Sequence, residues 1–181
     1  MRDDKAGNMM SARIRSERII IGIDPGLASL GYGLIVEGKN GQIRHLAHGC
    51  VKTSSEMPSA ERLRIIFNEI HSILILYKPD VGGIEDLYFF RNVSSALPVA
   101  EARGVIKLAF ILASVPLAEF TPNAIKKAVT GTARADKAQV QEMVRILLGL
   151  EKNPSPDHAA DALAAAICRL HSEGPVGISL S

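Results

Sequence analysis

Ile19-Ile20-Ile21-Gly22-Ile23-Asp24-Pro25-Gly26, residues 19–26, is the stretch that decides the fold of this chain. Its β-branched run is too short for a helix and ends at a turn, so a buried strand is expected over residues 19–24. Asp24 closes that strand. A carboxylate at the rim of a core is costly unless something compensates its charge, and a divalent cation would do so. The alternative is a turn aspartate whose side chain bonds its own backbone.

The segments that follow predict a mixed sheet. Lys39-Asn40-Gly41 is a hairpin signal between strands at 30–36 and 42–53, so the first three strands are antiparallel. An amphipathic helix at 59–77 leads to a strand at 81–85, and such a crossover favours a parallel placement. The remaining expected elements are a helix at 95–113, a strand at 116–120, and helices at 122–131, 136–148 and 155–170. The expected fold is therefore α/β, with three antiparallel strands, then two parallel ones, and helices on both faces of the five-stranded sheet.

Length and composition fit one domain. The 181 residues are 47% apolar, and the net charge of +2 does not by itself indicate a nucleic-acid partner. We expect a domain at 18–172 between a flexible leader at 1–17 and a flexible tail at 173–181. The leader lacks the apolar region of a signal peptide, and the apolar stretch at 105–118 is too short to span a bilayer, so a cytoplasmic protein is expected. Cys50 and Cys168 are expected to be buried thiols.

Glu85 ends the second long apolar run. Ligands in α/β sheets gather at the carboxyl ends of strands, which favours Glu85 as a partner of Asp24. Asp86 should face the opposite way because side chains alternate along a strand, although either acid could simply mark the chain leaving the core. The segment around Asp24 also suits the phosphate loop of sugar kinases and actin-like ATPases. A chain of 181 residues leaves no room for the second lobe that such ATPases need.

Asp157-His158-Ala159-Ala160-Asp161-Ala162-Leu163 is the most specific segment. On a helix, residues three or four apart are neighbours, so His158 and Asp161 point to one side and Asp157 nearly so. The alanines keep this end of the helix slim enough to approach the sheet. In the plainer interpretation, Asp157 only complements the helix dipole and His158 is a packed or exposed residue.

Together these segments resemble the RuvC family of bacterial Holliday-junction resolvases. The resemblance rests on Ile23-Asp24-Pro25-Gly26, Ile84-Glu85, Ala102-Arg103-Gly104 and the segment at 157–164, and covers roughly residues 18–172 in the right order. It implies an RNase H-like fold and a metal-binding catalytic tetrad of Asp24, Glu85, His158 and Asp161. Many members carry Asp at the third position, so Asp157 beside His158 is the alternative ligand.

The resemblance also implies the chemistry. We expect hydrolysis with two Mg²⁺ ions per subunit, bridged by Asp24, that leaves 5′-phosphate and 3′-hydroxyl ends. Because imidazole is a softer ligand than carboxylate, His158 leads us to expect that Mn²⁺ can substitute and supports at least as much cleavage as Mg²⁺. Lys126 is expected to act on the scissile phosphate and to belong to the catalytic set.

DNA contacts are expected from two places. The loop Leu87-Tyr88-Phe89-Phe90-Arg91-Asn92 gathers three of the eight aromatic residues, which suits base stacking at an opened junction, or else pins the loop to the core. By resemblance Tyr88 occupies the position of a stacking aromatic, with Phe89 next to it; Arg91 and Asn92 are further expected contacts. Among the basic residues at 126–137, Lys126 and Lys137 match basic residues of the family, although such charge runs are usually solvated. Arg103 and Lys107 could reach DNA or a subunit interface.

The expected function is resolution of four-way DNA junctions by paired nicks during recombination and repair. A symmetric homodimer would nick strands of like polarity, with part of its interface from an apolar helix face that includes Leu97, Val105, Leu108 and Leu112, unless that face packs only on the sheet. The resemblance implies a branch-migration motor of RuvA and RuvB as partner. Two alternatives stay open: an RNase H-like nuclease acting on RNA, and a junction-binding protein without catalysis.

Overall fold

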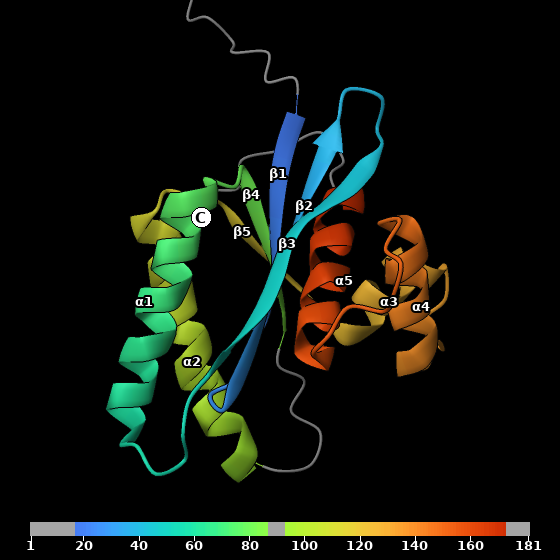
Figure 1. The fold of residues 1–181 in the computed structure, drawn as a ribbon. Coiled ribbons are helices and arrows are strands. Elements are labelled where there is room, and N and C mark those ends of the chain that lie inside the picture. Colours follow the sequence, from blue (N-terminus) through green and yellow to red (C-terminus); the bar gives the residue numbers. More distant parts are fainter. Residues whose placement is uncertain (1–16, 87–92, 173–181) are drawn as a thin grey trace, which may run out of the picture.

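A single five-stranded sheet forms the centre of the computed structural model, which describes residues 17–86 and 93–172 (Figure 1). The strands lie in the order β3-β2-β1-β4-β5. Their bounds are β1 Glu17–Asp24, β2 Ser29–Gly38, β3 Ile43–Lys52, β4 Val81–Glu85 and β5 Leu117–Phe120. β1, β2 and β3 pair antiparallel, and β4 and β5 add in parallel on the other side of β1. The prediction of three antiparallel strands followed by two parallel ones is confirmed.

The strand register brings two acidic residues together. β1 and β4 are parallel neighbours, and Ile23 pairs with Ile84. Asp24 and Glu85 each follow that pair by one residue, at the carboxyl ends of adjacent strands. Strands β2 and β3 and helix α1 separate them in the chain, and the return of the chain through α1 places β4 parallel beside β1.

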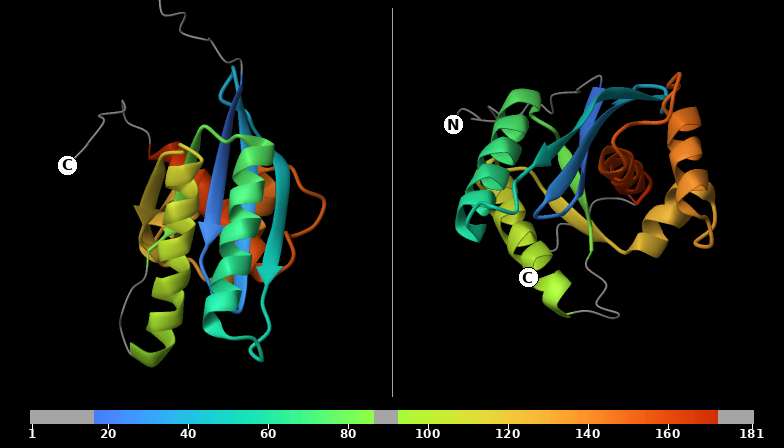
Figure 2. Two further views of the ribbon diagram at one scale, coloured as in Figure 1. Left: turned by 90° about the vertical axis from the view of Figure 1, so that its left-hand side faces the viewer. Right: turned by 60° about the horizontal axis from the view of Figure 1, so that its bottom comes forward.

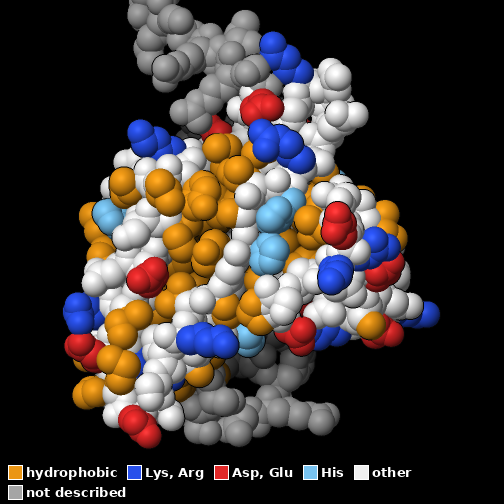
Figure 3. Space-filling view, viewed as in Figure 1, with side chains coloured by type: hydrophobic (Ala, Val, Ile, Leu, Met, Phe, Trp, Pro, Cys, Tyr) orange, Lys and Arg blue, Asp and Glu red, His pale blue; other side chains and the backbone are white. Residues whose placement is uncertain are grey.

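Helices α1 (Ser59–Tyr77) and α2 (Val93–Leu112) cover one face of the sheet, as Figures 1 and 2 show. The core under them is built from large side chains, among them Ile21, Leu34, Ile70 and Phe110, all at most 1% exposed. Some exposed side chains on both helices are apolar as well, among them Leu76 on α1 and Ile111 on α2. Figure 3 shows hydrophobic side chains at the surface over α1.

Helix α5 (Asp157–His171) covers the other face, with α3 (Pro122–Thr130) and α4 (Lys137–Leu147) packed beyond it. A run of alanines faces the sheet, including Ala162 and Ala166, which are fully buried. A Cβ atom added at Gly22 would overlap the backbone of both alanines, and one at Gly31 would overlap the backbone of His158. Small residues on both sides therefore let the helix backbone lie almost directly on the sheet.

The helix starts agree with the sequence signals. Thr121 caps α3 by accepting a hydrogen bond from the backbone N–H of Ala124, and Pro122 occupies the first turn. Asp136 and Gln139 form a capping box at the start of α4. Cys168 is buried as predicted, whereas Cys50 is only half-buried because it lies on the edge strand β3. In the described part of the chain, no helix is long and apolar enough to cross a membrane.

Candidate metal centre and nucleic-acid cleft

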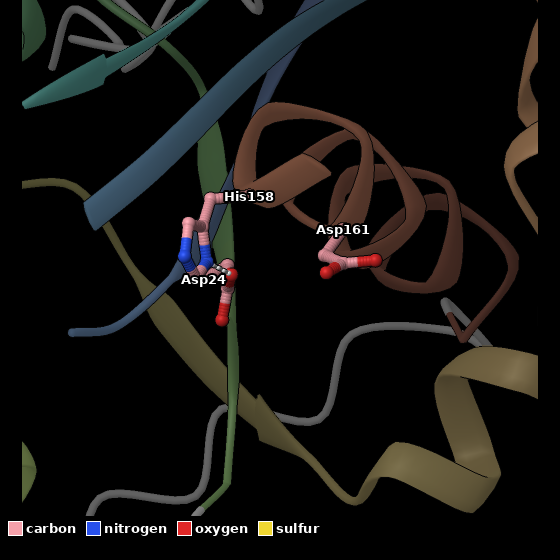
Figure 4. Close-up of side chains that lie close together, drawn as sticks. All are labelled: Asp24, His158 and Asp161. Carbon is pink, nitrogen blue, oxygen red and sulfur yellow. Dashed lines mark hydrogen bonds and ion pairs between the residues drawn. The ribbon is translucent and has the colours of Figure 1, made fainter. Parts of the chain in front are cut away.

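Asp24 and His158 meet where β1 ends and α5 begins. His158 Nδ1 lies 2.6 Å from Asp24 Oδ2, although the two residues are 134 positions apart (Figure 4). The close approach follows from Gly31, where only a missing side chain lets the first turn of α5 touch the sheet. When Nδ1 donates its proton to the carboxylate, Nε2 keeps a lone pair that can bind a cation.

Asp161 completes a group that fits a divalent cation. It lies one helical turn after His158, and potential ligand atoms of Asp24, His158 and Asp161 are all within 4.8 Å of one another. Among the described residues, this is the one group of three or more His, Cys, Asp or Glu side chains whose ligand atoms lie that close together. The donor set is mixed, with hard carboxylate oxygens that suit Mg²⁺ and an imidazole that suits Mn²⁺ or Zn²⁺ equally well.

Glu85 adds a third acidic group beside this triad. Burial first, and then the negative charges of Asp24 and Asp161, raise the pKa of Glu85 to about 7. Burial also raises the pKa of Asp24, against the hydrogen bond from His158, which lowers it. Both carboxyl groups are partly shielded from solvent and lie close to other negative charges, and both effects oppose ionisation. A bound cation would offset both effects.

A cleft opens beside the acidic groups and contains both predicted lysines. Its volume is about 200 Å³, and it is lined by Glu85, Pro122, Ile125, Lys126, Lys137, Val140, Asp161 and Ala164. Lys126 comes from α3 and Lys137 from the start of α4, so the layer beyond α5 brings positive charge to the site. Lys137 Nζ lies 3.3 Å from Asp161 Oδ2. A phosphate in this cleft would meet both acidic groups and lysines.

Asp157 points to a different set of partners. One carboxylate oxygen lies 3.1 Å from Lys137 Nζ, and the other accepts a hydrogen bond from Gln141 at 3.1 Å. The hydrogen bond to Lys137 is the main reason that the pKa of Asp157 is lowered. Partial burial would lower the pKa of Lys137, but its contacts with Asp157 and Asp161 outweigh this and raise it. Of the two candidates for the third ligand, His158 is the one in the triad.

The sequence left open whether Arg103 and Lys107 reach DNA or a subunit interface, and the structure shows both in ion pairs within the chain. Arg103 is buried and contacts Asp86 and Glu119, and Lys107 Nζ lies 2.5 Å from Glu119 Oε1. The helical spacing gave a usable signal, because Arg103 lies three residues before Ile106 and seven before Phe110, both of which are buried. Tyr88, Phe89, Arg91 and Asn92, the predicted DNA contacts of the loop, lie outside the described residues.

Comparison with known proteins identifies the family. Residues 20–169 match the family model described as "Crossover junction endodeoxyribonuclease RuvC". A protein of that name from Treponema pallidum (strain Nichols) is 52% identical over 153 residues, covering 84% of this chain and 78% of the relative. A second, from Treponema denticola, is 49% identical over 158 residues, covering 87% of this chain and 88% of the relative.

Solved structures agree with the sequence matches. The structure of Thermus thermophilus RuvC superposes with a TM-score of 0.78 at 37% identity and covers 84% of this chain and 93% of that one. The same protein in complex with a Holliday junction substrate gives a TM-score of 0.77 at 33% identity, covering 84% of this chain and 92% of that one. The sheet and its helices are thus those of an RNase H-like fold, as predicted.

Proposed function

The chain belongs to the RuvC family of crossover junction endodeoxyribonucleases, and we propose that it cuts four-way DNA junctions at the site built by Asp24, Glu85, His158 and Asp161. The observation that carries this proposal is the meeting of Asp24, His158 and Asp161 beside a cleft lined by two lysines. Such a site places acidic groups against a phosphodiester while the lysines offset the phosphate charge.

The four side chains are proposed to hold two Mg²⁺ ions per subunit, with Mn²⁺ able to substitute. Divalent ions held there would supply an activated water and charge stabilisation at the leaving 3′ oxygen. Asp24, from the central strand β1, interacts both with Glu85 and with His158, and we propose it as the ligand shared by the two ions. The products are then a 5′-phosphate and a 3′-hydroxyl.

The two lysines have separate proposed roles. Lys126 lines the cleft without a described ion pair to the acidic groups, which leaves its ammonium group available to the scissile phosphate. Lys137 contacts Asp157 and Asp161, so a phosphate has to compete with these carboxylates or arrive together with the cations. Tyr88, Phe89, Arg91 and Asn92 are proposed as further DNA contacts on the strength of the loop's composition and of the family resemblance.

His158 bears on metal preference. A site with one imidazole among carboxylates should bind Mn²⁺ more readily than a site of carboxylates alone. We therefore expect Mn²⁺ to support at least as much cleavage as Mg²⁺, and His158→Asp to lower the ratio of Mn²⁺-supported to Mg²⁺-supported cleavage. A metal titration of both proteins measures this, and activity of the unaltered protein with Mg²⁺ alone would contradict the assignment.

A symmetric homodimer is proposed to pair two such sites across a junction. The outward face of α2 carries exposed apolar residues: Leu97 is 60%, Leu108 51%, Ile111 75% and Leu112 58% exposed. Val105 does not belong to this face, because it packs against the core. Ile75 and Leu76 extend the apolar surface onto the neighbouring end of α1. Several large apolar side chains exposed on one face are typical of a protein contact. The branch-migration motor of RuvA and RuvB is proposed as partner by family resemblance alone.

Cleavage of a synthetic four-way junction tests the proposal. The expected result is paired nicks that require Mg²⁺ or Mn²⁺, with no cutting of a linear DNA duplex or an RNA duplex of the same sequence. Asp24→Asn keeps the size of the side chain but removes its charge, so it should reduce cleavage by about 10³-fold or more while junction binding remains.

Asp157→Asn is the matched control for that variant. It removes a carboxylate from the first turn of α5, next to His158, but one that contacts Lys137 and Gln141 instead of the triad. Cleavage should stay within a few-fold of the unaltered protein. A loss as large as that of Asp24→Asn would make Asp157 the third ligand, and unchanged cleavage by Asp24→Asn would remove the basis of the proposal.

A further inference from the structure

Helix α2 carries a buried charge on its inner face. Within residues 17–86 and 93–172, Arg103 is the charged residue that is buried, at 6% exposed. Burying a guanidinium is expensive unless its donors are satisfied, and replacing a buried ion pair with apolar side chains is often neutral or stabilising. A buried arginine at this place is therefore poorly explained by stability alone.

The guanidinium binds three groups around the end of β4. Nη1 donates to the backbone carbonyl of Glu85, and Nη2 donates to the carboxylate of Glu119. Nη2 also lies 3.0 Å from Asp86 Oδ1. One planar, rigid fork thus holds a main-chain oxygen, the next side chain, and a residue of the neighbouring strand β5.

The sheet itself holds Glu85 on one side only. The pairing of β4 with β1 ends at Ile84, whereas Glu85 still pairs with Phe120 of β5. The Asp86 N–H donates to the Phe120 carbonyl at 2.7 Å, also on the β5 side. This N–H and the Glu85 carbonyl belong to one peptide group, so β5 holds one end of the last peptide of the strand and Arg103 holds the other.

We propose that Arg103 is a positioning residue, which orients the Glu85 peptide so that its carboxylate points toward Asp24 and Asp161. This inference rests on the proposed function, because it takes Glu85 to be a metal ligand. A displacement of about 1 Å in a metal ligand costs on the order of 10²-fold in rate. The guanidinium that fixes the Glu85 backbone therefore matters for the rate, as does the chemical identity of the ligand itself. Arg103 acts through Glu85 and touches no reacting atom.

Lys107 supplies a matched control. It lies one turn after Arg103 on the same helix and binds the same Glu119, but the structure gives it no contact with Glu85. If neutralising Glu119 were the whole role, Arg103→Gln and Lys107→Gln would behave alike. If orientation of Glu85 is the role, only Arg103→Gln affects the metal site.

The test measures Mn²⁺ affinity of the metal-free protein by calorimetry or electron paramagnetic resonance, together with kcat at saturating Mn²⁺ and junction affinity without metal. Arg103→Gln should weaken Mn²⁺ binding about tenfold and lower kcat by about 10- to 100-fold, with junction affinity within twofold. Arg103→Lys, which retains one donor and the charge, should recover part of both losses. Lys107→Gln should change Mn²⁺ affinity by less than threefold.

A double variant separates positioning from folding stability. Arg103→Met with Glu119→Met replaces the buried guanidinium and its 40% exposed partner with apolar side chains and should restore the melting temperature lost in Arg103→Gln, yet keep the weakened Mn²⁺ binding. Recovery of Mn²⁺ affinity along with stability, or unaltered Mn²⁺ affinity in Arg103→Gln, overturns the inference. Failure of the unaltered protein to bind Mn²⁺ or to cut a junction would instead overturn the proposed function.

Discussion

The two faces of the sheet are built on opposite principles. The face under α1 and α2 is filled by large side chains such as Leu34 and Phe110, so helices and sheet are separated by a full layer of side chains. On the face under α5, glycines in the strands and alanines in the helix let the helix backbone lie against the strands, although Ile20 and Ile35 also pack there. Both faces bury apolar surface, but only the second fixes the position of a helix to within the size of a methyl group.

This difference explains where the site lies. A helix separated from the sheet by isoleucine and phenylalanine can shift slightly as side chains repack, whereas a helix in backbone contact cannot. His158 and Asp161 lie at the start of α5 and depend on that contact to reach Asp24. The α1/α2 face has looser requirements and leaves apolar side chains exposed on its outside, where a second copy is proposed to bind.

The largest expected effect comes from adding one methyl group to the α5 face. In Gly22→Ala the new Cβ would overlap the backbone of Ala162 and Ala166, so the helix has to move away from the sheet. We expect the free energy of unfolding to fall by about 3 kcal/mol or more, and cleavage to be lost even where the protein still folds. Urea denaturation and junction cleavage measure the two effects.

Ile21→Val is the control for that change. Ile21 is the neighbouring residue of β1 and faces the α1/α2 core, so the substitution removes one methylene from the opposite face. It should cost about 0.5–1.5 kcal/mol and leave the cleavage rate of the folded protein unchanged. Equal losses from the two variants would mean that the faces do not differ in the way argued above.

The sequence predicted the strands, their directions and the three groups of the triad, because these depend on local patterns. Apolar runs that end at Asp24 and Glu85, and helical spacing between His158 and Asp161, can be read without knowledge of the partner. The distribution of glycines could be seen but not interpreted. The sequence predicted that the alanines let the last helix approach the sheet, but no local pattern shows that Gly22, Gly31 and Gly33 are the strand positions opposite it.

Arg103 and Asp157 show why the rest could not be predicted. Both are charged residues in recognised motifs; Arg103 could have reached DNA or a subunit interface, and Asp157 could have been a metal ligand or have complemented the helix dipole. Their roles depend on which atoms lie opposite them: the Glu85 carbonyl for Arg103, and Lys137 and Gln141 for Asp157. Such pairings join elements far apart in the chain, and no local pattern records them.

A charged residue introduced on the outer surface of α2 tests whether the α1/α2 side of the molecule forms the dimer interface. Ile111 is 75% exposed, so Ile111→Glu should leave the fold of a single chain intact. At a dimer interface it would bury a carboxylate, and we expect the dimer dissociation constant to rise at least about tenfold. Analytical ultracentrifugation measures the assembly, and a junction labelled on two strands shows whether the paired nicks become independent.

Ile146→Glu on α4 provides the matched control, because Ile146 is 55% exposed on the opposite side of the molecule. It should leave the dimer unchanged. If it disrupts assembly and Ile111→Glu does not, the interface lies over the α3 and α4 layer.

The smallest expected effect concerns Glu85, which lies next to the start of α5, and the pH dependence of the free energy of unfolding. The pKa of Glu85 is raised to about 7 from an ordinary value of 4.5. Between these pH values the folded, metal-free protein retains a proton that the unfolded chain releases, so the free energy of unfolding falls as pH rises from about 4.5 to about 7 and levels off above that. Glu85→Gln mimics the protonated carboxyl group and should remove this contribution.

At pH 7.5 the metal-free Glu85→Gln variant should therefore be more stable than the unaltered protein by on the order of 1 to 2 kcal/mol, and at pH 4.5 the difference should vanish. Glu56→Gln, in an exposed turn, serves as the control and should follow the unaltered protein at both pH values. Mn²⁺ should reverse the order at pH 7.5, because a cation stabilises the ionised carboxylate and the amide binds it poorly. A Glu85→Gln variant that is less stable than the unaltered protein at pH 7.5 without metal would mean that Glu85 is held by a partner and is not strained by its acidic neighbours. In that case the clustering of carboxylates at the start of α5 would not lower the stability of the metal-free protein.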